Sequence, residues 1–274
     1  LQKTLPLPTT TAAQRSLAES PVYGTMQPSI LTVTRGKALQ SLLPSGPEDQ
    51  QILEIISAVD TVTFGIGAAK SSVMGIPIPA CPYVYLTGEE NTLAGIKQAL
   101  KNTFPKKWEK TDIAGWSAVE INKNCQMGDV SVPLVAASKA GVLALAMTDS
   151  TEFLKTMQPA GEIVGSVTQA YAPGIQCPLE KTESIAVLDV KRLWQETVQL
   201  VGPGSALHPH IEQTADTKVV SAFDRLCTLE PPILAIAGWE STPGTWDGYI
   251  LMNKADSTDF FATLSALLRA IDKQ

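Results

Sequence analysis

One stretch of this chain occurs twice, and its recurrence constrains the fold more than any other feature. Residues 143–157 (LALAMTDSTEFLKTM) and residues 250–264 (ILMNKADSTDFFATL) each join an apolar strand-like run, a short polar motif and the start of a helical pattern. The motifs DSTEF and DSTDF match at every position if Glu is allowed for Asp. A looser third copy is residues 83–100, where Asn91 stands in place of the aspartate. A capping Asp followed three positions later by an acidic residue is typical of a helix start, so the recurrence indicates repeated architecture.

The expected elements fall into two halves with the same β-α-α-β-β-α order. The first half has expected strands at 29–33, 61–68 and 83–87 and expected helices at 37–43, 48–59 and 92–102. The second half has expected strands at 184–189, 233–239 and 248–253 and expected helices at 190–201, 211–229 and after Asp256. Further strands are expected at 116–122, 130–137, 142–147 and 161–172, whereas the proline-rich residues 70–82 are expected to form a loop. An IAGW tetrapeptide that precedes the repeated motif in both halves supports an internal duplication.

We therefore predict an α+β fold of internally duplicated β-α-α-β-β-α units, with ferredoxin-like antiparallel sheets that carry helices on one face. The predicted parts are a flexible tether at 1–27, a first repeat with inserted strands at 28–172 and a second repeat at 173–274. Asn91, Asp149 and Asp256 are the predicted helix N-caps. The apolar residues expected to face inward from the last helix are Phe260, Leu264, Leu267, Leu268 and Ile271.

The start of the chain bears on its cellular location. Residues 2–20 are polar, are rich in Thr, Ala and Pro, and have no apolar core of their own. Such a composition suits a flexible tether that follows a removed signal peptide or a lipid-anchored cysteine upstream of Leu1. We therefore expect an extracytoplasmic location, in the periplasm or on the outer surface; an ordinary frayed terminus of a cytoplasmic protein is the alternative.

Charge and hydropathy argue against two classes of function. The formal net charge is −6, whereas non-specific nucleic-acid binding requires a basic face that displaces counterions from phosphate. The longest apolar stretch, residues 132–147, is interrupted by Pro133, Lys139 and Gly141, so it is too broken to form the roughly 20-residue apolar helix that spans a bilayer. We therefore expect neither a nucleic-acid partner nor a transmembrane span.

The duplicated, cap-rich α+β pattern behind a polar tether resembles the poorly characterised exported or lipid-anchored bacterial proteins with ferredoxin-like repeats. The similarity covers roughly the whole chain in pattern and includes no signature motif. It implies an envelope location and no assigned activity, and it supplies no functional residues.

The four cysteines are widely spaced and form no C-x-x-C pair, which argues against zinc-ribbon and thioredoxin-type sites. They are Cys81, Cys125, Cys177 and Cys227. An even number is compatible with two disulfides in an oxidising compartment. Of the three pairings that four cysteines allow, we favour Cys81–Cys125 and Cys177–Cys227, because each pair lies within one repeat. Free buried thiols are the alternative.

The candidate metal ligands are His208 and His210, the only histidines in the chain. Neutral imidazole suits zinc or copper, and Glu212 and Asp216 are the nearest further ligands in sequence. No ligand-spacing motif completes the set, and exposed histidines are common in Gly/Pro-rich turns.

Two further patterns invite a functional interpretation. Trp239 and Trp246 flank the polar hairpin tip 240–245 and could stack on a glycan or a partner protein, although such residues more often close the end of a core. Residues 65–72 (GIGAAKSS) end like a phosphate-binding loop, but Ala69 occupies the place of the Gly that must precede the Lys. A glycine-bearing strand is the simpler interpretation of that segment.

These patterns together predict a non-enzymatic exported module with a binding or structural role, without catalytic residues and without a cofactor. The partner is expected to be a protein or a glycan. One alternative is a metal-dependent hydrolase-type enzyme that uses the region around His208 and His210. A second alternative is an envelope scaffold that self-associates through an exposed sheet edge or face.

Overall fold

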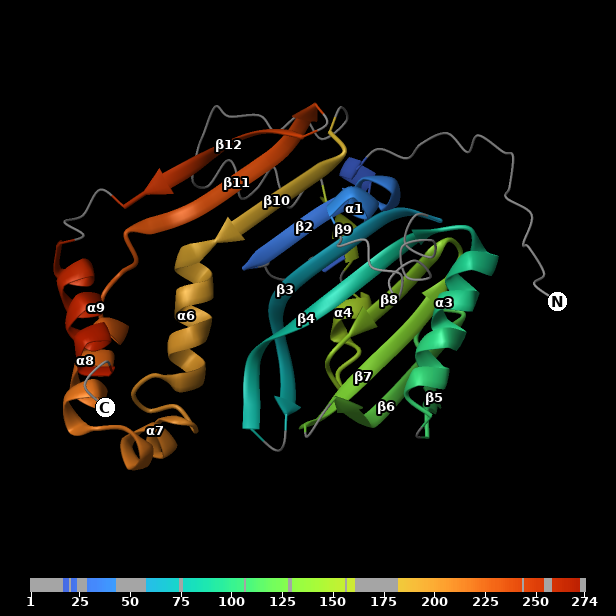
Figure 1. Cartoon of the computed structure of the whole chain (residues 1–274). Coiled ribbons are helices and arrows are strands. Elements are labelled where there is room, and N and C mark those ends of the chain that lie inside the picture. Colours follow the sequence, from blue (N-terminus) through green and yellow to red (C-terminus); the bar gives the residue numbers. More distant parts are fainter. Residues whose placement is uncertain are drawn as a thin grey trace.

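The computed structural model describes residues 17–19, 21–23, 29–42, 58–73, 76–105, 107–127, 130–155, 157–160, 182–242, 244–253 and 258–271. In these residues a ten-stranded antiparallel sheet crosses the whole molecule and is accompanied by seven α-helices (Figure 1). The predicted α+β class with antiparallel sheet structure is confirmed.

The strands of this sheet follow the order β12-β11-β10-β2-β3-β4-β8-β7-β6-β5. Their bounds are β2 Ile30–Arg35, β3 Val59–Val73, β4 Ile76–Gly88, β5 Glu109–Thr111, β6 Ala118–Met127, β7 Val130–Lys139, β8 Val142–Ala146, β10 Ser184–Asp189, β11 Ile233–Thr242 and β12 Thr245–Met252. Two short strands, β1 (Pro21–Tyr23) and β9 (Met157–Pro159), form a separate antiparallel pair.

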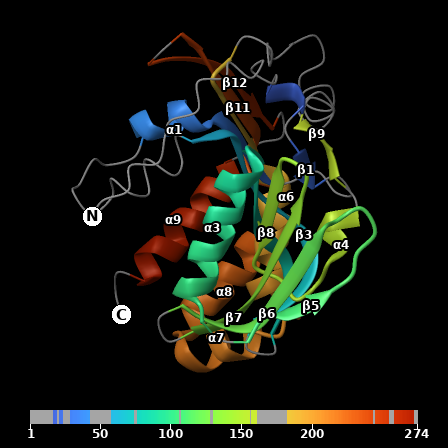
Figure 2. The ribbon, with the colours of Figure 1, turned by 90° about the vertical axis from the view of Figure 1, so that its right-hand side faces the viewer.

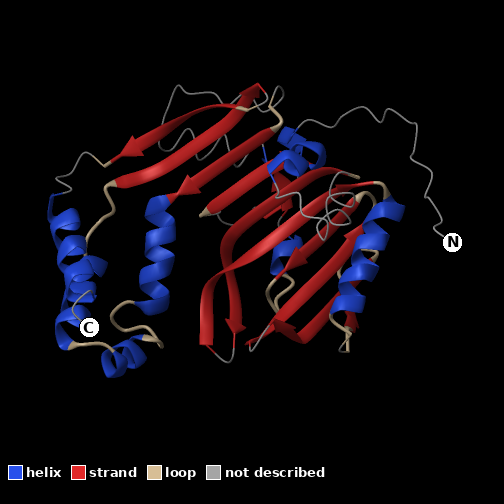
Figure 3. Cartoon of the chain, in the orientation of Figure 1, coloured by secondary structure: helices blue, strands red, loops and turns tan. Residues whose placement is uncertain are grey.

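Helices and short elements lie on both faces of the sheet. Their bounds are η1 Leu17–Glu19, α1 Gly36–Leu42, α3 Glu90–Thr103, α4 Glu152–Lys155, α6 Val190–Val201, α7 His208–Thr214, α8 Thr217–Cys227 and α9 Thr258–Ile271. Figure 2 shows α3 and α9 on one side of the sheet, and α4 with the β1–β9 pair on the other. Helices α6 to α9 gather at the end of the molecule that carries β10, β11 and β12 (Figure 3).

The core follows from the alternation of side chains along the strands. Leu31 and Val33 of β2 lie on the same face as Tyr85 of β4, and this face is closed by Phe153 of α4 and by Leu17. On the opposite face, Leu93 of α3 packs with Leu143 of β8. The sheet is therefore buried on both sides around β4 and β8.

The two halves of the chain meet at the pair β2–β10, which is antiparallel with Ile30 opposite Leu188 and Thr34 opposite Ser184. From this pair, β3 and β4 extend the sheet in one direction, and β11 and β12 extend it in the other. Strand β2 lies directly beside β3, and β10 lies directly beside β11, both in antiparallel orientation. In the chain, the two strands of each pair are separated by helical segments. The ferredoxin-like duplicated arrangement is not confirmed by this topology.

Residues 70–82, predicted to be a loop, instead complete a long β3–β4 hairpin. Val73 lies opposite Ile76 and Ser72 opposite Pro77, with an irregularity between Ala68 and Ser71. The loop was predicted because proline is rarely found in the interior of a strand, and this prediction was wrong. Strand β8 pairs with β4 from Tyr83 to Thr87, and among the described strands the part of β4 before Pro82 pairs with β3 alone.

The helix starts also differ in part from the predictions. Helix α3 begins at Glu90 with Glu89 at the N-cap position, so Asn91 lies in the first turn and is not the cap. In the repeated motif, the Glu152 N–H donates to Ser150 Oγ and the Ser150 N–H to Thr148 Oγ1, at 3.3 and 3.0 Å. Short hydroxyl side chains therefore make the turn that was assigned to Asp149.

Some predicted elements lie outside the described residues: the strand at 161–172, the capping Asp256 and nearly all of the helix at 48–59. Strand β6 continues as far as Met127, beyond the predicted strand end at residue 122. In the last helix, Leu268 and Ile271 are exposed rather than inward, and the buried residue is Thr263.

Candidate functional site

The most exposed large hydrophobic side chains in the described part of the chain all belong to its last strand and its last helix. They are Trp246, Ile250 and Met252 of β12, with 46%, 61% and 52% exposure, and Phe261, Leu268 and Ile271 of α9, with 50%, 54% and 48%. We call these six residues the β12–α9 surface. Exposed apolar residues usually scatter singly over a protein, so their concentration in two consecutive elements marks this face as a candidate binding site.

The three strand residues share one face of the sheet because they are an even number of positions apart. Ile250 lies directly opposite Ile236 of β11, and Trp246 lies opposite Glu240. The position between them is Gly248, which pairs with Gly238. A Cβ atom added to Gly238 would stand 3.5 Å from Cε3 of Trp246, so the indole lies against bare backbone. The face is therefore apolar and contains a shallow glycine platform.

Helix α9, the next described element after β12 in the chain, has an apolar stripe of its own. Phe261, Leu268 and Ile271 have the i, i+7, i+10 spacing of one helix face. Helix α9 is anchored, because it packs on α8 and the Phe260 ring meets the Trp194 ring of α6 edge-on at 5.7 Å. Figure 1 shows α9 at the same outer edge of the molecule as β12. The stripe is thus held on a fixed helix at the end of the sheet.

The two outer edges of the sheet differ in a way that bears on function. Strand β5 has three residues, two of them charged, and its Glu109 pairs with Lys123 at 2.9 Å. Strand β12 has eight residues, and Asp247 is the only charged one. Short, charged edge strands resist pairing with another chain, whereas long apolar ones invite it. Of the two outermost described strands, β12 is therefore the longer and the more apolar.

The two predicted tryptophans do not share a site. Trp239 lies opposite Asp247, one position from the pair Glu240–Trp246, so the two indoles point to opposite faces of the hairpin. Trp239 packs against the central core, as the alternative interpretation had it. Only Trp246 belongs to the β12–α9 surface. Sequence reasoning missed the helix part of this surface because the α9 periodicity was read as inward-facing.

The histidines lie apart from one another. His208 is buried at the start of α7, with Nε2 3.5 Å from Glu212 Oε1 and 3.4 Å from Asp224 Oδ1, while His210 is exposed. Asp216 accepts a bond from the Lys218 N–H and caps α8. Among the described residues, no three His, Cys, Asp or Glu side chains are grouped so that they could hold a metal ion.

The predicted disulfide between Cys81 and Cys125 is not formed, and both residues are buried. Cys81 lies on β4 and Cys125 on β6, and strands β8 and β7 separate them. With neighbouring strands about 4.8 Å apart, this exceeds the reach of a disulfide. Cys227 is a free thiol, and Cys177 lies outside the described residues. Burial raises the pKa of Cys81 to about 12, so its thiol is inert at neutral pH.

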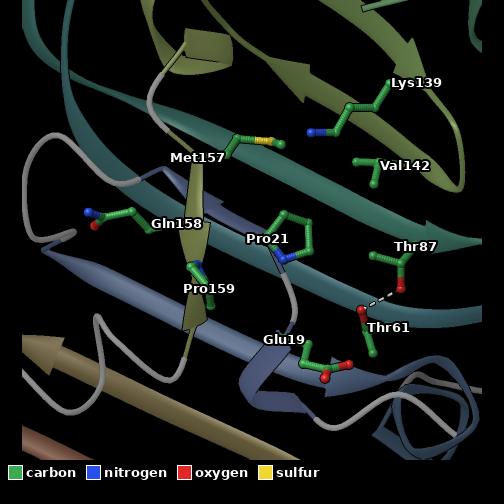
Figure 4. A pocket seen from close by; sticks show the side chains of 9 residues that line it. All are labelled: Glu19, Pro21, Thr61, Thr87, Lys139, Val142, Met157, Gln158 and Pro159. Carbon is green, nitrogen blue, oxygen red and sulfur yellow. Dashed lines mark hydrogen bonds between the residues drawn. The ribbon is translucent and has the colours of Figure 1, made fainter. Parts of the chain in front are cut away.

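A pocket of about 240 Å³ lies between the β1–β9 pair and the large sheet. Figure 4 shows Lys139 and Glu19 on opposite sides of it, with Thr61 and Thr87 bonded to each other at 2.7 Å. Burial lowers the pKa of Lys139, whose ammonium stands 5.1 Å from the Trp116 ring centroid. The described lining residues therefore offer one ammonium, one carboxylate and two hydroxyls.

The glycine-bearing segment that resembles a phosphate loop is part of strand β3. A Cβ atom at Gly65 would stand 2.3 Å from the ring of Tyr83, the residue directly opposite on β4. Gly65 is therefore required for the close approach of this buried tyrosine, which agrees with the simpler interpretation of the segment.

Fold and surface together define an α+β protein whose antiparallel sheet has, among the described strands, the largely apolar β12 at one end. Comparison of the chain with protein-family models, with curated proteins and with solved structures finds no match. None of the described helices combines the length and the hydropathy needed to cross a membrane.

Proposed function

We propose that this protein is a non-enzymatic, exported module that acts by binding another protein through the β12–α9 surface. The observation that carries the proposal is the concentration of six half-exposed large apolar side chains on one edge strand and the helix that follows it.

The size of the surface supports this role. Half of a large side chain corresponds to on the order of 100 Å², so the six side chains together offer on the order of 600 Å² of apolar area. That is the upper range for the largest patch of a typical monomer and approaches the roughly 800 Å² per partner of a stable protein interface. A glycan partner is less well matched, because the surface contains one aromatic strand residue and few polar groups.

We further propose that the two halves of the chain derive from one duplicated unit. In support, β2-β3-β4 and β10-β11-β12 are both consecutive antiparallel triplets that extend away from the shared β2–β10 pair. In this comparison β12 corresponds to β4. The outer edge of β4 is covered by β8, and one face of β4 is covered by α3, whereas no described strand lies beyond β12 in the sheet. Superposition of the two triplets in a crystal structure tests the duplication, and strands of different order or direction would contradict it.

The exported location rests on the polar N-terminal segment and on the resemblance to envelope proteins. Fractionation of the cells that make the protein tests it. We expect the protein in the periplasm or at the outer surface, and a purely cytoplasmic protein would exclude this part of the proposal.

Protein binding is tested by photo-crosslinking in the same cells. A photoreactive amino acid at position 250 should give a discrete covalent adduct whose partner peptide is identified by mass spectrometry. The same group at Ala94, an exposed position of α3, is the matched control and should give none. The adduct should disappear when Leu268→Lys is added. If position 250 yields no protein adduct, or an adduct indifferent to Leu268→Lys, the proposed binding surface is wrong.

A further inference from the structure

The pocket of about 240 Å³ between the β1–β9 pair and the large sheet is a second candidate site, distant from β12 in the strand order. Its described lining carries one cation, Lys139 of β7, and one anion, Glu19 of η1, which Figure 4 shows on opposite sides. We infer that the pocket binds a small amino acid, whose carboxylate contacts the Lys139 ammonium and whose ammonium contacts the Glu19 carboxylate. The inference goes beyond the proposed protein-binding role and rests on different residues.

The floor of the pocket is one row of side chains that crosses the neighbouring strands β7, β8, β4 and β3. Lys139 lies opposite Val142, and Val142 lies opposite Thr87. Thr87 in turn lies opposite Thr61, and the two hydroxyls are held by their bond at 2.7 Å. Directly opposite residues share one face of a sheet, and neighbouring strands are about 4.8 Å apart, so the row extends over roughly 14 Å. The row therefore has a cation at one end and two hydroxyls at the other.

Lys139 is a half-buried cation at the wall of the pocket. Its ammonium stands 5.1 Å from the centroid of the Trp116 ring, and Figure 4 shows its side chain directed toward Met157 of β9. Within the part of the chain that the structure describes, Lys139 forms no ion pair, and burial lowers its pKa. A partly desolvated cation is costly unless a counter-charge accompanies it. A ligand carboxylate supplies that counter-charge and accepts a strong, charge-assisted hydrogen bond from the ammonium.

The carboxylate of Glu19 determines what the other end of the ligand carries. Glu19 is exposed at the side of the pocket opposite to Lys139, and it is in no ion pair with another described residue. A second carboxylate on the ligand would be repelled there, whereas an ammonium is attracted. Opposite charges on opposite sides of one pocket therefore favour a zwitterion over a dicarboxylate or a diamine.

The apolar lining and the volume limit the size of the ligand. Pro21, Met157 and Pro159 of the β1–β9 pair face the pocket with Val142 of the floor, and they suit a short hydrocarbon chain between the two charges. Because a water molecule takes up about 30 Å³ of the liquid, the pocket has room for roughly eight non-hydrogen atoms. This is less than the roughly 300–1,000 Å³ of sites for drug-sized ligands. The ω-amino acids from 3-aminopropanoate to 6-aminohexanoate meet these limits.

Isothermal titration calorimetry of the purified protein with this series of ω-amino acids tests the inference. At least one member should bind saturably at a single site per chain. The controls for the tightest binder are the fatty acid, the dicarboxylate and the diamine of equal chain length; for 4-aminobutyrate these are pentanoate, glutarate and 1,4-diaminobutane. Each control lacks one of the two charged contacts and should bind at least about 10-fold more weakly than the amino acid.

Two substitutions test the assigned contacts. Lys139→Met removes the charge and should weaken the tightest binder at least about 10-fold. Glu19→Gln removes the repulsion of a second carboxylate and should narrow the difference in affinity between the amino acid and the dicarboxylate, which a loss of structure does not do. Lys123→Met, the matched control, removes an exposed lysine of β6 that pairs with Glu109 and should leave binding unchanged. Circular dichroism should show all three variants folded, and if Lys139→Met does not fold, the Glu19→Gln result decides.

Three results would overturn the inference. The first is that no ω-amino acid of the series binds saturably at concentrations up to about 10 mM. The second is that the dicarboxylate binds wild type as tightly as the amino acid of equal length. The third is an affinity that a folded Lys139→Met variant leaves unchanged. None of these results bears on the β12–α9 surface, whose test is the adduct at position 250.

Discussion

The hydroxyl of Tyr85 donates a 2.9 Å hydrogen bond to the backbone carbonyl of Phe153. Their rings also meet, with centroids 6.2 Å apart. Tyr85 lies on β4 in the middle of the sheet, and Phe153 is the last residue of the DSTEF motif. The motif therefore attaches the short helix α4 to the centre of the sheet, and its aromatic residue closes the core.

Removing this hydroxyl should destabilise the fold. Tyr85→Phe keeps the ring but leaves the buried Phe153 carbonyl without this donor, so we expect a loss of about 1–3 kcal/mol in the free energy of unfolding. Urea denaturation followed by circular dichroism measures it. The matched control is Thr197→Val, which removes an exposed hydroxyl that bonds Leu193 O within α6 and should change stability far less. Equal effects of both variants would contradict the assignment.

A buried ion pair joins α3 to β6. Glu120, whose side chain is 8% exposed, contacts Lys97 Nζ at 3.0 Å and Lys101 Nζ at 2.9 Å. Glu120→Gln should lower the free energy of unfolding by about 3 kcal/mol at pH 7, because Lys97 remains buried without its counter-ion. Glu109→Gln removes the exposed partner of Lys123 and should leave the denaturation midpoint unchanged.

The carboxylate of Glu120 should also make the stability of the fold depend on pH. Burial acts to raise the pKa of Glu120, but hydrogen bonds from Lys101 and Lys97 outweigh burial and hold its pKa below the ordinary value. A carboxyl with a lowered folded-state pKa stabilises the fold above its unfolded pKa, and this contribution is lost as the pH falls through the folded pKa. The stability difference between wild type and Glu120→Gln should therefore be largest near neutral pH and shrink below about pH 4. A difference independent of pH would exclude this origin.

The thiols should react in a defined order. Burial raises the pKa of Cys81 to about 12, and burial followed by the charge of Asp224 raises the pKa of the half-buried Cys227. Alkylation of the native protein at pH 8, followed by peptide mass spectrometry, should label Cys227 well before Cys81 and Cys125. A native peptide that links Cys81 to Cys125 would contradict the strand order, since two strands lie between them.

Two glycine substitutions should have opposite effects. Gly95→Ala lies in α3 with no atom within 4 Å of the added Cβ, so it should stabilise the fold by about 0.5–1 kcal/mol through helix propensity. Gly65→Ala forces its Cβ against the buried Tyr83 ring and should destabilise by about 1–3 kcal/mol. Thermal denaturation compares the two, and a Gly65→Ala variant as stable as wild type would show that the ring does not lie over the glycine.

The local elements with clear patterns could be predicted from the sequence. Helix α6 spans the predicted residues 190–201, and β10 spans the predicted residues 184–189. Both succeed because a capping Asp189, whose carboxylate accepts the Arg192 N–H at 2.9 Å, separates a short apolar run from an amphipathic one. The β3–β4 hairpin was not predicted because its prolines are typical of a loop, whereas the pairing of the two strands is a property of the assembled sheet.

The candidate surface could be predicted only in part. Trp246 was recognised as a candidate binding residue, but Leu268 and Ile271 were assigned to the core. The periodicity of α9 shows that the helix has an apolar stripe, and it does not show whether the rest of the fold covers that stripe. In this structure α9 packs on α8 and meets Trp194 through Phe260, which leaves the stripe at the outer edge.

The sequence by itself determined the α+β class, most element positions and the apolar character of the last strand and helix, because these follow from local periodicity and capping. Only the tertiary structure decided which strands became neighbours, which thiols lay apart and which apolar faces stayed exposed. The physical reason is that strand order and burial arise from contacts between residues far apart in the chain, and no local pattern encodes them. The repeated DSTEF motif depends on both the local sequence and the tertiary structure. Hydroxyl side chains form its local turn, whereas the position of Phe153 depends on its contact with Tyr85.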